Sequence, residues 1–141
     1  MPPKNKIMLE IITPKETVFK EKVDVIEAPA VDGLIGILPN HAPLITTLKT
    51  GVIRANIDNK DRFISVSEGI MDVKPHQINI VARTAELPED IDLERAKEAK
   101  ERAKERLEES SSKMDHARAE GAMERAIARI KAAEKHHSEY Y

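Results

Sequence analysis

Six arginines in the last third of the chain repeat one spacing, which is the clearest sign of chemistry in the sequence. They form two sets that each follow i, i+7 and i+11: Arg95, Arg102 and Arg106, then Arg118, Arg125 and Arg129. Seven residues bring an α-helix back to within about 20° of its starting direction, and eleven overshoot by a similar amount. Each set therefore predicts one ridge along a helix. Such a ridge either pairs with glutamates on a solvated face, as Glu98 with Arg102, or binds phosphates or an acidic protein surface.

The rest of the sequence offers little for catalysis. It contains no cysteine, which excludes disulfides, thiolate zinc sites and cysteine nucleophiles. Neither glycine-rich phosphate loop, G-x-x-x-x-G-K-[ST] or G-x-G-x-x-G, occurs, and the histidines lack H-x-x-H or H-E-x-x-H spacing. His41, held between Pro39 and Pro43, is interpreted as a polar side chain of an exposed loop that can serve an interface. We therefore expect a protein that is not an enzyme.

Charge and hydropathy limit the partners and the location. The net charge is −2 and only two aromatic residues precede Pro88, which argues against nucleic acid as a partner. No apolar run approaches the roughly 20 residues of a membrane helix, and the first residues lack the apolar core of a signal peptide. We expect a soluble, cytoplasmic chain that reaches a membrane only through a partner.

The composition changes abruptly near Pro88. All eight prolines and four of the five glycines lie at or before this residue. Before it, short apolar runs are separated by turn signals such as Asp32-Gly33 and Thr50-Gly51, a pattern typical of a β-sandwich or barrel with eight or more strands. One such run, residues 17–28, alternates with an irregularity expected near Glu21-Lys22.

Residues after Pro88 predict two helices that fold back on each other. Asp90 or Asp92 can cap the first helix and Asp115 the second. Their facing stripes are rich in alanine, including Ala96, Ala103, Ala119 and Ala126, and bury little apolar surface. We therefore expect a hairpin that is only marginally held and can exchange partners. The tail from His136 to Tyr141 gives no interpretable pattern.

Three stretches of the β part carry a family resemblance. Residues 33–44 read G-L-I-G-I-L-P-N-H-A-P-L, and Gly51-Val52-Ile53 and Ser67-Glu68-Gly69-Ile70 follow. In this order they resemble the E-G-x-x-G-I-L/Y-P-x-H-A-P-L, G-x-[VI] and S-G-G-[IF] stations of the epsilon subunit of the bacterial F-type ATP synthase, over residues 6–134. Two departures are Glu68, where a glycine is usual, and Leu34, where many members have glutamate.

The resemblance implies an α+β fold, with a ten-stranded β-sandwich over residues 1–88 and an antiparallel two-helix hairpin over residues 89–141. It implies a non-catalytic central-stalk subunit at the cytoplasmic face of the membrane. The sandwich would dock on the gamma subunit and the c-ring through Asp32, Leu34, His41 and Pro43. The helices would inhibit ATP hydrolysis by extending from the sandwich toward acidic residues of the beta subunit. A structural adaptor whose helices form a fixed clamp remains the alternative.

Some members of this family bind ATP on the folded hairpin through the motif I/L-D-x-x-R-A. Residues 91–96 of this chain, I-D-L-E-R-A, match it in full. The resemblance thus implies a site for ATP, alone or with Mg²⁺, as a regulatory ligand and not as a required cofactor. Its residues would be Glu86, Ile91, Asp92, Arg95, Ala96, Arg102, Arg118, Arg125 and Arg129. Asp92 and Glu86 would contact the adenine amino group or the ribose, and the arginines the phosphates.

Overall fold

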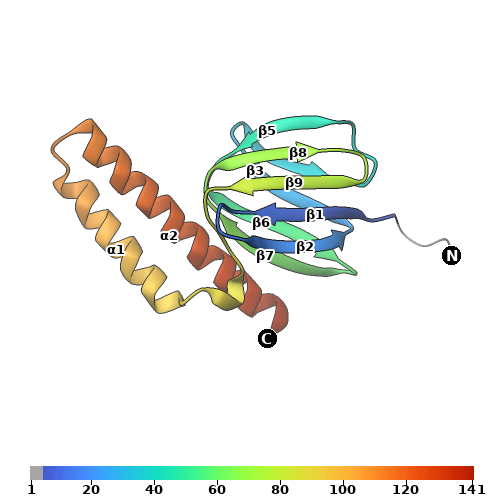
Figure 1. The fold of residues 1–141 in the computed structure, drawn as a ribbon. Helices are drawn as coiled ribbons and strands as arrows, with labels where there is room; N and C mark the ends of the chain where they lie inside the picture. The colour runs from blue at the N-terminus through green and yellow to red at the C-terminus, as the bar shows by residue number, and fades with distance from the viewer. Residues whose placement is uncertain (1–4) are drawn as a thin grey trace.

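The computed structural model describes residues 5–141 and has a β part followed by a helical arm (Figure 1). The strands are β1 (Ile7–Ile12), β2 (Thr17–Val23), β3 (Val25–Ala30), β4 (Gly33–Ile37), β5 (Leu44–Leu48), β6 (Gly51–Ile57), β7 (Lys60–Val66), β8 (Gly69–Val73), β9 (Gln77–Ala82) and β10 (Ala85–Glu86). A 3₁₀ turn η1 (Pro88–Asp90) leads into helices α1 (Leu93–Glu109) and α2 (Lys113–Tyr140). The expected α+β fold of ten strands and two helices is confirmed.

The ten strands form two layers that share an edge. One layer has the order β4-β3-β6-β7-β10 and the other β5-β8-β9-β1-β2, with antiparallel pairing except between β1 and β9. Strand β3 pairs with β6 through Val25–Glu27 and reaches the second layer where Ala30 pairs with Leu48 of β5. The result is a β-sandwich that closes along one edge. This architecture is intermediate between the sandwich and the barrel that the strand pattern predicted.

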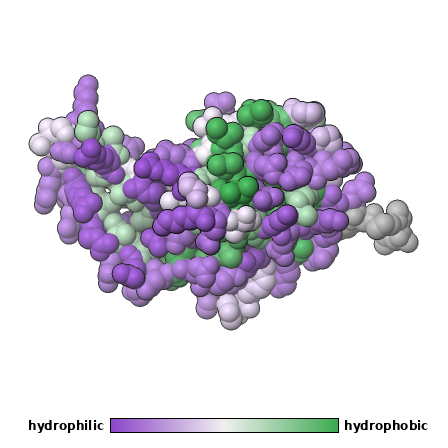
Figure 2. Space-filling view, viewed as in Figure 1, coloured by the Kyte–Doolittle hydropathy of each residue, from purple (hydrophilic) through white to green (hydrophobic). Residues whose placement is uncertain are grey.

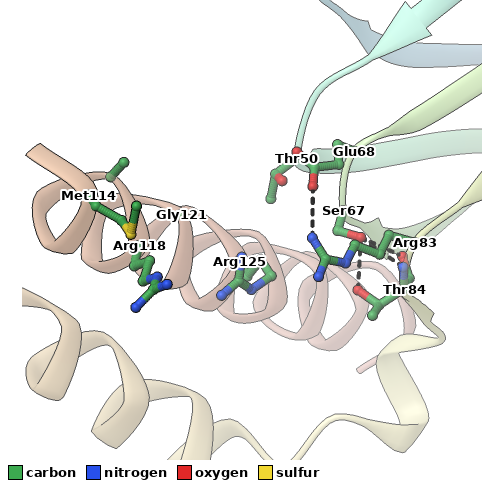
Figure 3. Close-up of a pocket in the computed structure, with 10 residues that line it drawn as sticks. Thr50, Ser67, Glu68, Arg83, Thr84, Met114, Arg118, Gly121 and Arg125 are labelled. Atoms are coloured by element: carbon green, nitrogen blue, oxygen red, sulfur yellow. Dashed lines mark hydrogen bonds and ion pairs between the residues drawn. The ribbon is translucent and has the colours of Figure 1, made fainter.

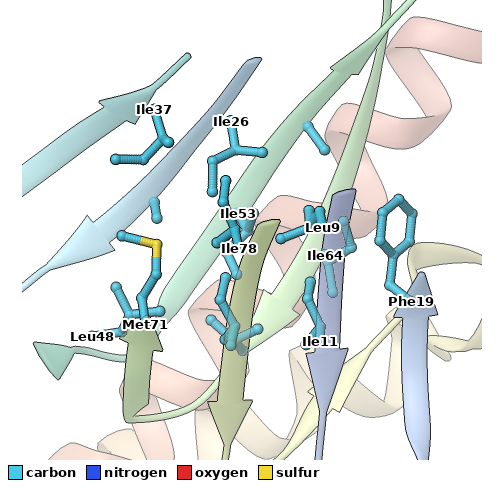
Figure 4. Close-up of a cluster of buried hydrophobic side chains, with 14 of the residues drawn as sticks. Leu9, Ile11, Phe19, Ile26, Ile37, Leu48, Ile53, Ile64, Met71 and Ile78 are labelled. Atoms are coloured by element: carbon cyan, nitrogen blue, oxygen red, sulfur yellow. The ribbon is translucent and has the colours of Figure 1, made fainter. Parts of the chain in front are cut away.

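Alternating apolar residues fill the space between the layers (Figure 4). Ile7, Leu9 and Ile11 of β1 all point inward and are fully buried. On β7 the alternation predicted from sequence puts Ile64 and Val66 in this core. The opposite face of β7 carries Phe63 and Ser65, and Ser67 follows the end of the strand; all three are buried as well although they lie outside the core cluster. That second burial comes from the helical arm.

One expectation about the strands is wrong in its position. The interruption in residues 17–28 falls at Asp24, not near Glu21-Lys22, so the segment forms the two strands β2 and β3. The carboxylate of Asp24 accepts a hydrogen bond from the backbone N–H of Asp58 at 2.8 Å and one from Lys6 Nζ at 3.3 Å. These polar contacts hold Asp24 at the sheet edge, where the chain changes direction.

The helical arm is an antiparallel hairpin with an alanine seam, as expected. Ala96 and Ala103 of α1 are buried, as are Ala119 and Ala126 of α2. In Figure 1, α2 lies next to the strands and α1 lies outermost, in agreement with the packing of α2 on β7, β6 and α1. Small side chains allow this close approach but bury little apolar area.

The two helices begin at side-chain caps. Asp92 Oδ1 accepts from the backbone N–H of Arg95 at 3.1 Å, which confirms one of the two predicted caps of α1. The predicted cap of α2 is wrong, because Ser112 Oγ takes this role by accepting from the N–H of Asp115 at 3.1 Å. Asp115 instead lies in the first turn, where its negative charge stabilises the helix by its interaction with the positive end of the helix dipole. Neither helix of the described chain is long and apolar enough to cross a membrane.

Candidate functional site

The arginine ridge of α2 runs along a chain of three clefts. Arg106 of α1 and Arg118 of α2 line a cleft of about 350 Å³ near the hairpin turn. Arg118 and Arg125 line the next cleft, of about 680 Å³. Arg125 and Arg129 line a third of about 210 Å³ beside Glu86 of β10. The structure therefore brings together Glu86, Arg118, Arg125 and Arg129 of the predicted site.

Most of the ridge arginines have no acidic partner. Arg129 Nε lies 2.9 Å from Glu86 Oε1, and Arg129 also donates to Glu86 Oε2 at 3.2 Å. Within residues 5–141, the other five ridge arginines form no ion pair, and the expected pairing of Glu98 with Arg102 is absent. Uncompensated guanidinium groups along the two helices favour an anionic ligand or partner.

The largest cleft separates α2 from one end of the sandwich (Figure 3). Its sandwich side consists of Thr50, Ser67, Glu68, Arg83 and Thr84, from the connections β5–β6, β7–β8 and β9–β10. The backbone N–H of Thr84 donates to Ser67 Oγ at 2.7 Å, which fixes two of these connections together. Arg83 pairs with Glu68 at 3.3 Å, so the residue that replaces the usual family glycine offsets one arginine charge.

The sandwich side of this cleft could not be predicted from the sequence. Ser67, Arg83 and Thr84 follow strand ends in two connections, and their types and spacing carry no local motif. Only the packing of α2 on β7 brings them opposite Arg118 and Arg125. The nearest signal was Glu68, because it departs from the family pattern at this end of the sandwich.

The residues of the I-D-x-x-R-A motif have other positions in this structure. Asp92 caps α1, Ala96 is fully buried in the seam, and the Ile91 N–H donates to the Pro88 carbonyl at 3.2 Å. Arg95 and Arg102 are exposed on α1. None of these five residues lines the three clefts above. The structure thus holds the α2 half of the predicted site together and leaves the α1 half apart from it.

An ion pair joins the sandwich to the start of the arm. Arg62 NH1 of β7 lies 2.9 Å from Glu89 Oε2 of η1, and Arg62 NH2 donates to Glu89 Oε1 at 3.1 Å. Burial alone would raise the pKa of Glu89, but the hydrogen bond and charge of Arg62 lower this pKa below its usual value of 4.5. The carboxylate is therefore fully ionised near neutral pH.

The predicted docking residues lie at two separate places. Asp32 is exposed in the β3–β4 turn, next to Gly33 with φ of 126°, and Leu34 is exposed at the start of β4. His41 and Pro43 follow the other end of β4, where His41 Nδ1–H donates to the carbonyl of Ala42 at 2.7 Å. Five residues of strand separate the two places by about 17 Å.

An apolar stripe crosses the sheet that does not carry the arm. Ile12 of β1 pairs with Val81 of β9, Val81 pairs with Ile70 of β8, and Ile70 pairs with Thr47, whose carbonyl accepts from the N–H of Val31. Val31, Ile70 and Val81 are 58%, 55% and 54% exposed. Figure 2 shows a green band over this part of the sandwich. We call Ile12, Val31, Ile70 and Val81 the apolar stripe; the sequence analysis did not predict it as a surface.

Comparisons with known proteins agree with the resemblance. Residues 6–88 match the family model of the ATP synthase delta/epsilon chain β-sandwich domain, and residues 89–134 match that of its long α-helix domain. The ATP synthase epsilon chain of Desulforamulus reducens is 50% identical over 126 residues, which cover 89% of this chain and 96% of that protein. That of Syntrophobacter fumaroxidans is 43% identical over 130 residues, covering 92% and 97%.

A solved structure shares the fold. A chain of the mitochondrial ATP synthase of Euglena gracilis superposes with a TM-score of 0.78 at 23% identity, covering 92% of this chain and 81% of that one. At this identity the likeness concerns the fold alone. The two family models together span nearly the whole sequence. The chain therefore belongs to the family of ATP synthase delta/epsilon chains.

Proposed function

We propose that this chain is the non-catalytic epsilon subunit of an F-type ATP synthase and works in the central stalk at the cytoplasmic face of the membrane. Its sandwich docks on the gamma subunit and the c-ring, and its helical arm restrains ATP hydrolysis. The observation that carries this proposal is the division of the sandwich into two faces. The arm packs on β6 and β7, whereas the apolar stripe lies on the other sheet. The arm can therefore change position without releasing the docked sandwich.

The apolar stripe is the proposed contact with gamma. The exposed Ile70 and Val81 are paired on neighbouring strands, with Ile12 and Val31 on either side, and such an apolar patch is typical of the core of an interface. Asp32, Leu34, His41 and Pro43, at the two ends of β4, are the proposed contacts toward the c-ring and the adjoining part of gamma. The two places permit contacts with different partners or with two copies of one partner.

Co-purification with gamma tests the docking face. A lysine in place of Ile70 or Val81 would bury an unpaired charge at the contact, and we expect loss of the complex. Ile127→Lys is the matched control, because Ile127 is 42% exposed on α2 and far in sequence from the stripe. Retention of gamma by both stripe variants at the level of the control would contradict this assignment.

The brake is the second part of the proposal. The arm presents arginines without acidic partners, and an extended arm can pair them with carboxylates of the beta subunit. Removing residues 89–141 should leave assembly intact and raise the ATPase activity of the complex. Unchanged hydrolysis would reject the brake and favour the fixed adaptor. Hydrogen exchange as slow in the arm as in the sandwich would also favour that adaptor.

ATP, alone or with Mg²⁺, is the proposed regulatory ligand of the folded arm. The unpaired Arg118 and Arg125 support this proposal, and the adjacent Glu86 can accept from an adenine amino group. Glu86 is bound to Arg129 here, so binding requires this ion pair to open, and the α1 residues Asp92, Arg95 and Arg102 must approach from their exposed positions. A ligand that bridges both helices stabilises the folded form by its differential affinity.

Calorimetry on the full chain tests this site. We expect heat on titration with ATP, with and without Mg²⁺, and at least a tenfold weaker affinity after Arg125→Ala, since hydrogen bonds to charged groups contribute about 1.5–3 kcal/mol. Lys131→Ala removes an exposed cation elsewhere on α2 and serves as control. Absence of heat, or equal affinity of Arg125→Ala and the control, would reject the site as described.

A further inference from the structure

The last two turns of α2 are fastened to the sandwich by a group of contacts that the function above does not explain. Tyr140 Oη donates to the carbonyl of Asp61 at 2.9 Å, and the N–H of Asp61 donates to Glu139 Oε1 at 3.2 Å. Both backbone polar groups of Asp61, at the start of β7, are thus bound by two neighbouring residues of the helix. Two hydrogen bonds to the backbone of one residue fix both the position and the orientation of the helix end relative to β7.

Cationic side chains add a second layer to this contact. Lys60 Nζ lies 5.2 Å from the centroid of the Tyr140 ring and donates to the Glu139 carbonyl at 3.5 Å. One turn earlier, Lys135 Nζ lies 5.7 Å from the ring centroid of Phe63. The ring of His136 lies at 4.7 Å from that of Tyr140, tilted by 35°, and packs against it from the helix side. Cation–π contacts thus run in both directions: a lysine of β7 lies over a helix tyrosine, and a lysine of α2 lies over a phenylalanine of β7.

The helix side of this contact lies outside the part of the chain that the family models match. The match to the long α-helix domain ends at residue 134, while Lys135, His136, Glu139 and Tyr140 all follow it. Figure 1 shows this end of α2 beside the sandwich, at the opposite end of the helix from the hairpin turn. The seam with α1 and the Arg129–Glu86 pair hold the rest of α2, so the tail adds an independent attachment.

We propose that residues 135–140 are a latch that holds the arm folded by gripping β7 at Lys60 and Asp61. These contacts exist only while α2 lies on the sandwich, so each one shifts the equilibrium toward the folded arm by its own free energy. The proposal rests on the proposed function in one respect, namely that the arm leaves the sandwich. The latch itself lies in residues beyond the family match, and it favours the folded arm over the extended arm that inhibits ATP hydrolysis.

Hydrogen exchange of the isolated full-length chain tests the latch. Tyr140→Phe removes the hydroxyl that binds Asp61, and Lys60→Ala removes the cation above the ring. Each should accelerate exchange of α2 amides between Met114 and Ala128 by about 2- to 10-fold, with core strands such as β1 and β9 unchanged. The double variant should accelerate exchange by less than the product of the two single effects, because both act on one contact.

Tyr141→Phe is the matched control. It makes the same chemical change at the neighbouring tyrosine, which is 89% exposed. Within residues 5–141 the ring of Tyr141 contacts two rings of its own helix, edge-on with His136 and stacked on His137. Equal exchange in Tyr140→Phe, Lys60→Ala and this control would overturn the latch. Acceleration confined to the last turn of α2 would also overturn it, because that result describes fraying and not release of the arm.

The ATPase activity of the assembled complex separates the latch from the brake. If both are correct, Tyr140→Phe releases the arm more often and lowers ATP hydrolysis relative to Tyr141→Phe. Faster exchange of the isolated chain with unchanged hydrolysis supports the latch and counts against the brake. Unchanged exchange overturns the latch whatever the hydrolysis does, so failure of the two proposals can be told apart.

Discussion

The sandwich and the arm bury different types of apolar side chain. The sandwich buries branched aliphatic side chains completely, among them Ile7, Ile11, Ile53 and Ile80, whereas every buried residue of α1 and α2 is an alanine. A fully buried isoleucine contributes about 1.5–3 kcal/mol, and a methyl group contributes far less. One chain therefore contains a body that resists opening and an arm that can be released at low cost.

Polar contacts join the two regions at three places. Arg129 binds Glu86, Arg62 binds Glu89, and Tyr140 binds Asp61. Where α2 covers β7, it meets Ser65 of the strand and Ser67 just after it. The helical spacing puts Ala128 and Ala132 on the same face as Arg125. Polar contacts at a surface exchange readily for water or for another partner, so this interface is suited to opening and closing again.

The largest expected effect is a core substitution in the sandwich. Ile80→Ala removes a fully buried side chain of β9 and should lower the free energy of unfolding by about 2–5 kcal/mol, because the cavity cannot close completely. Ile127→Ala on the half-exposed face of α2 should cost about 0.5 kcal/mol or less. Urea denaturation measures both values. Similar losses for the two variants would contradict the contrast between body and arm.

A glycine in the sandwich gives the next effect. A Cβ on Gly69 would lie 2.2 Å from the carbonyl oxygen of Val81 and 2.9 Å from the Cα of Ala82, so β8 and β9 must separate. We expect Gly69→Ala to cost about 1–3 kcal/mol in thermal or urea unfolding. In Gly36→Ala the nearest atom is the Ile26 carbonyl at 4.0 Å, and this control should change stability much less. Equal behaviour would show that the two strands can yield.

Loss of a helix cap should affect the arm alone. Asp92→Ala removes the acceptor for the Arg95 N–H and should destabilise α1 by about 1 kcal/mol. Hydrogen exchange should therefore accelerate in the first turns of α1, while exchange in the sandwich stays as it was. Asp90→Ala is the control, since the side chain of Asp90 caps neither η1 nor α1. Slower or unchanged exchange in α1 would argue that packing, and not the cap, holds this end.

The smallest effect concerns pH and the junction. The pKa of Glu89 is lowered in the folded state, so its pair with Arg62 stabilises the fold fully above about pH 4.5. This contribution is lost as the pH falls through the lowered pKa. The difference in melting temperature between the native chain and Glu89→Gln should thus be constant near neutral pH and shrink below pH 4.5. A difference in melting temperature that grows on acidification would contradict the lowered pKa of Glu89. We expect the whole difference to be small, because the ion pair is partly exposed to solvent.

Local patterns in the sequence were enough to predict the elements. Turn signals such as Asp32-Gly33 separate short apolar runs, and these runs became strands with the expected alternation. The alanine stripes predicted a hairpin of two helices, and Asp92 was one of the two predicted candidates for the cap of α1. The predicted cap of α2, Asp115, was wrong, because Ser112 is an equally good capping residue and the choice depends on where the chain leaves the turn.

The sequence determined the strands, the helices and the arginine ridges, because these depend on periods of two and of 3.6 residues within a short segment. The tertiary structure decided which surfaces of the sandwich the helices cover. Ser65 and Ser67 are polar residues that lie buried next to α2. Arg83 and Arg118 line the same cleft only because a strand connection and a distant helix lie side by side. The tail gave no pattern, because its partners Lys60 and Asp61 lie 79 and 78 residues away in the chain. Such contacts follow from packing of complete elements, which no local spacing records.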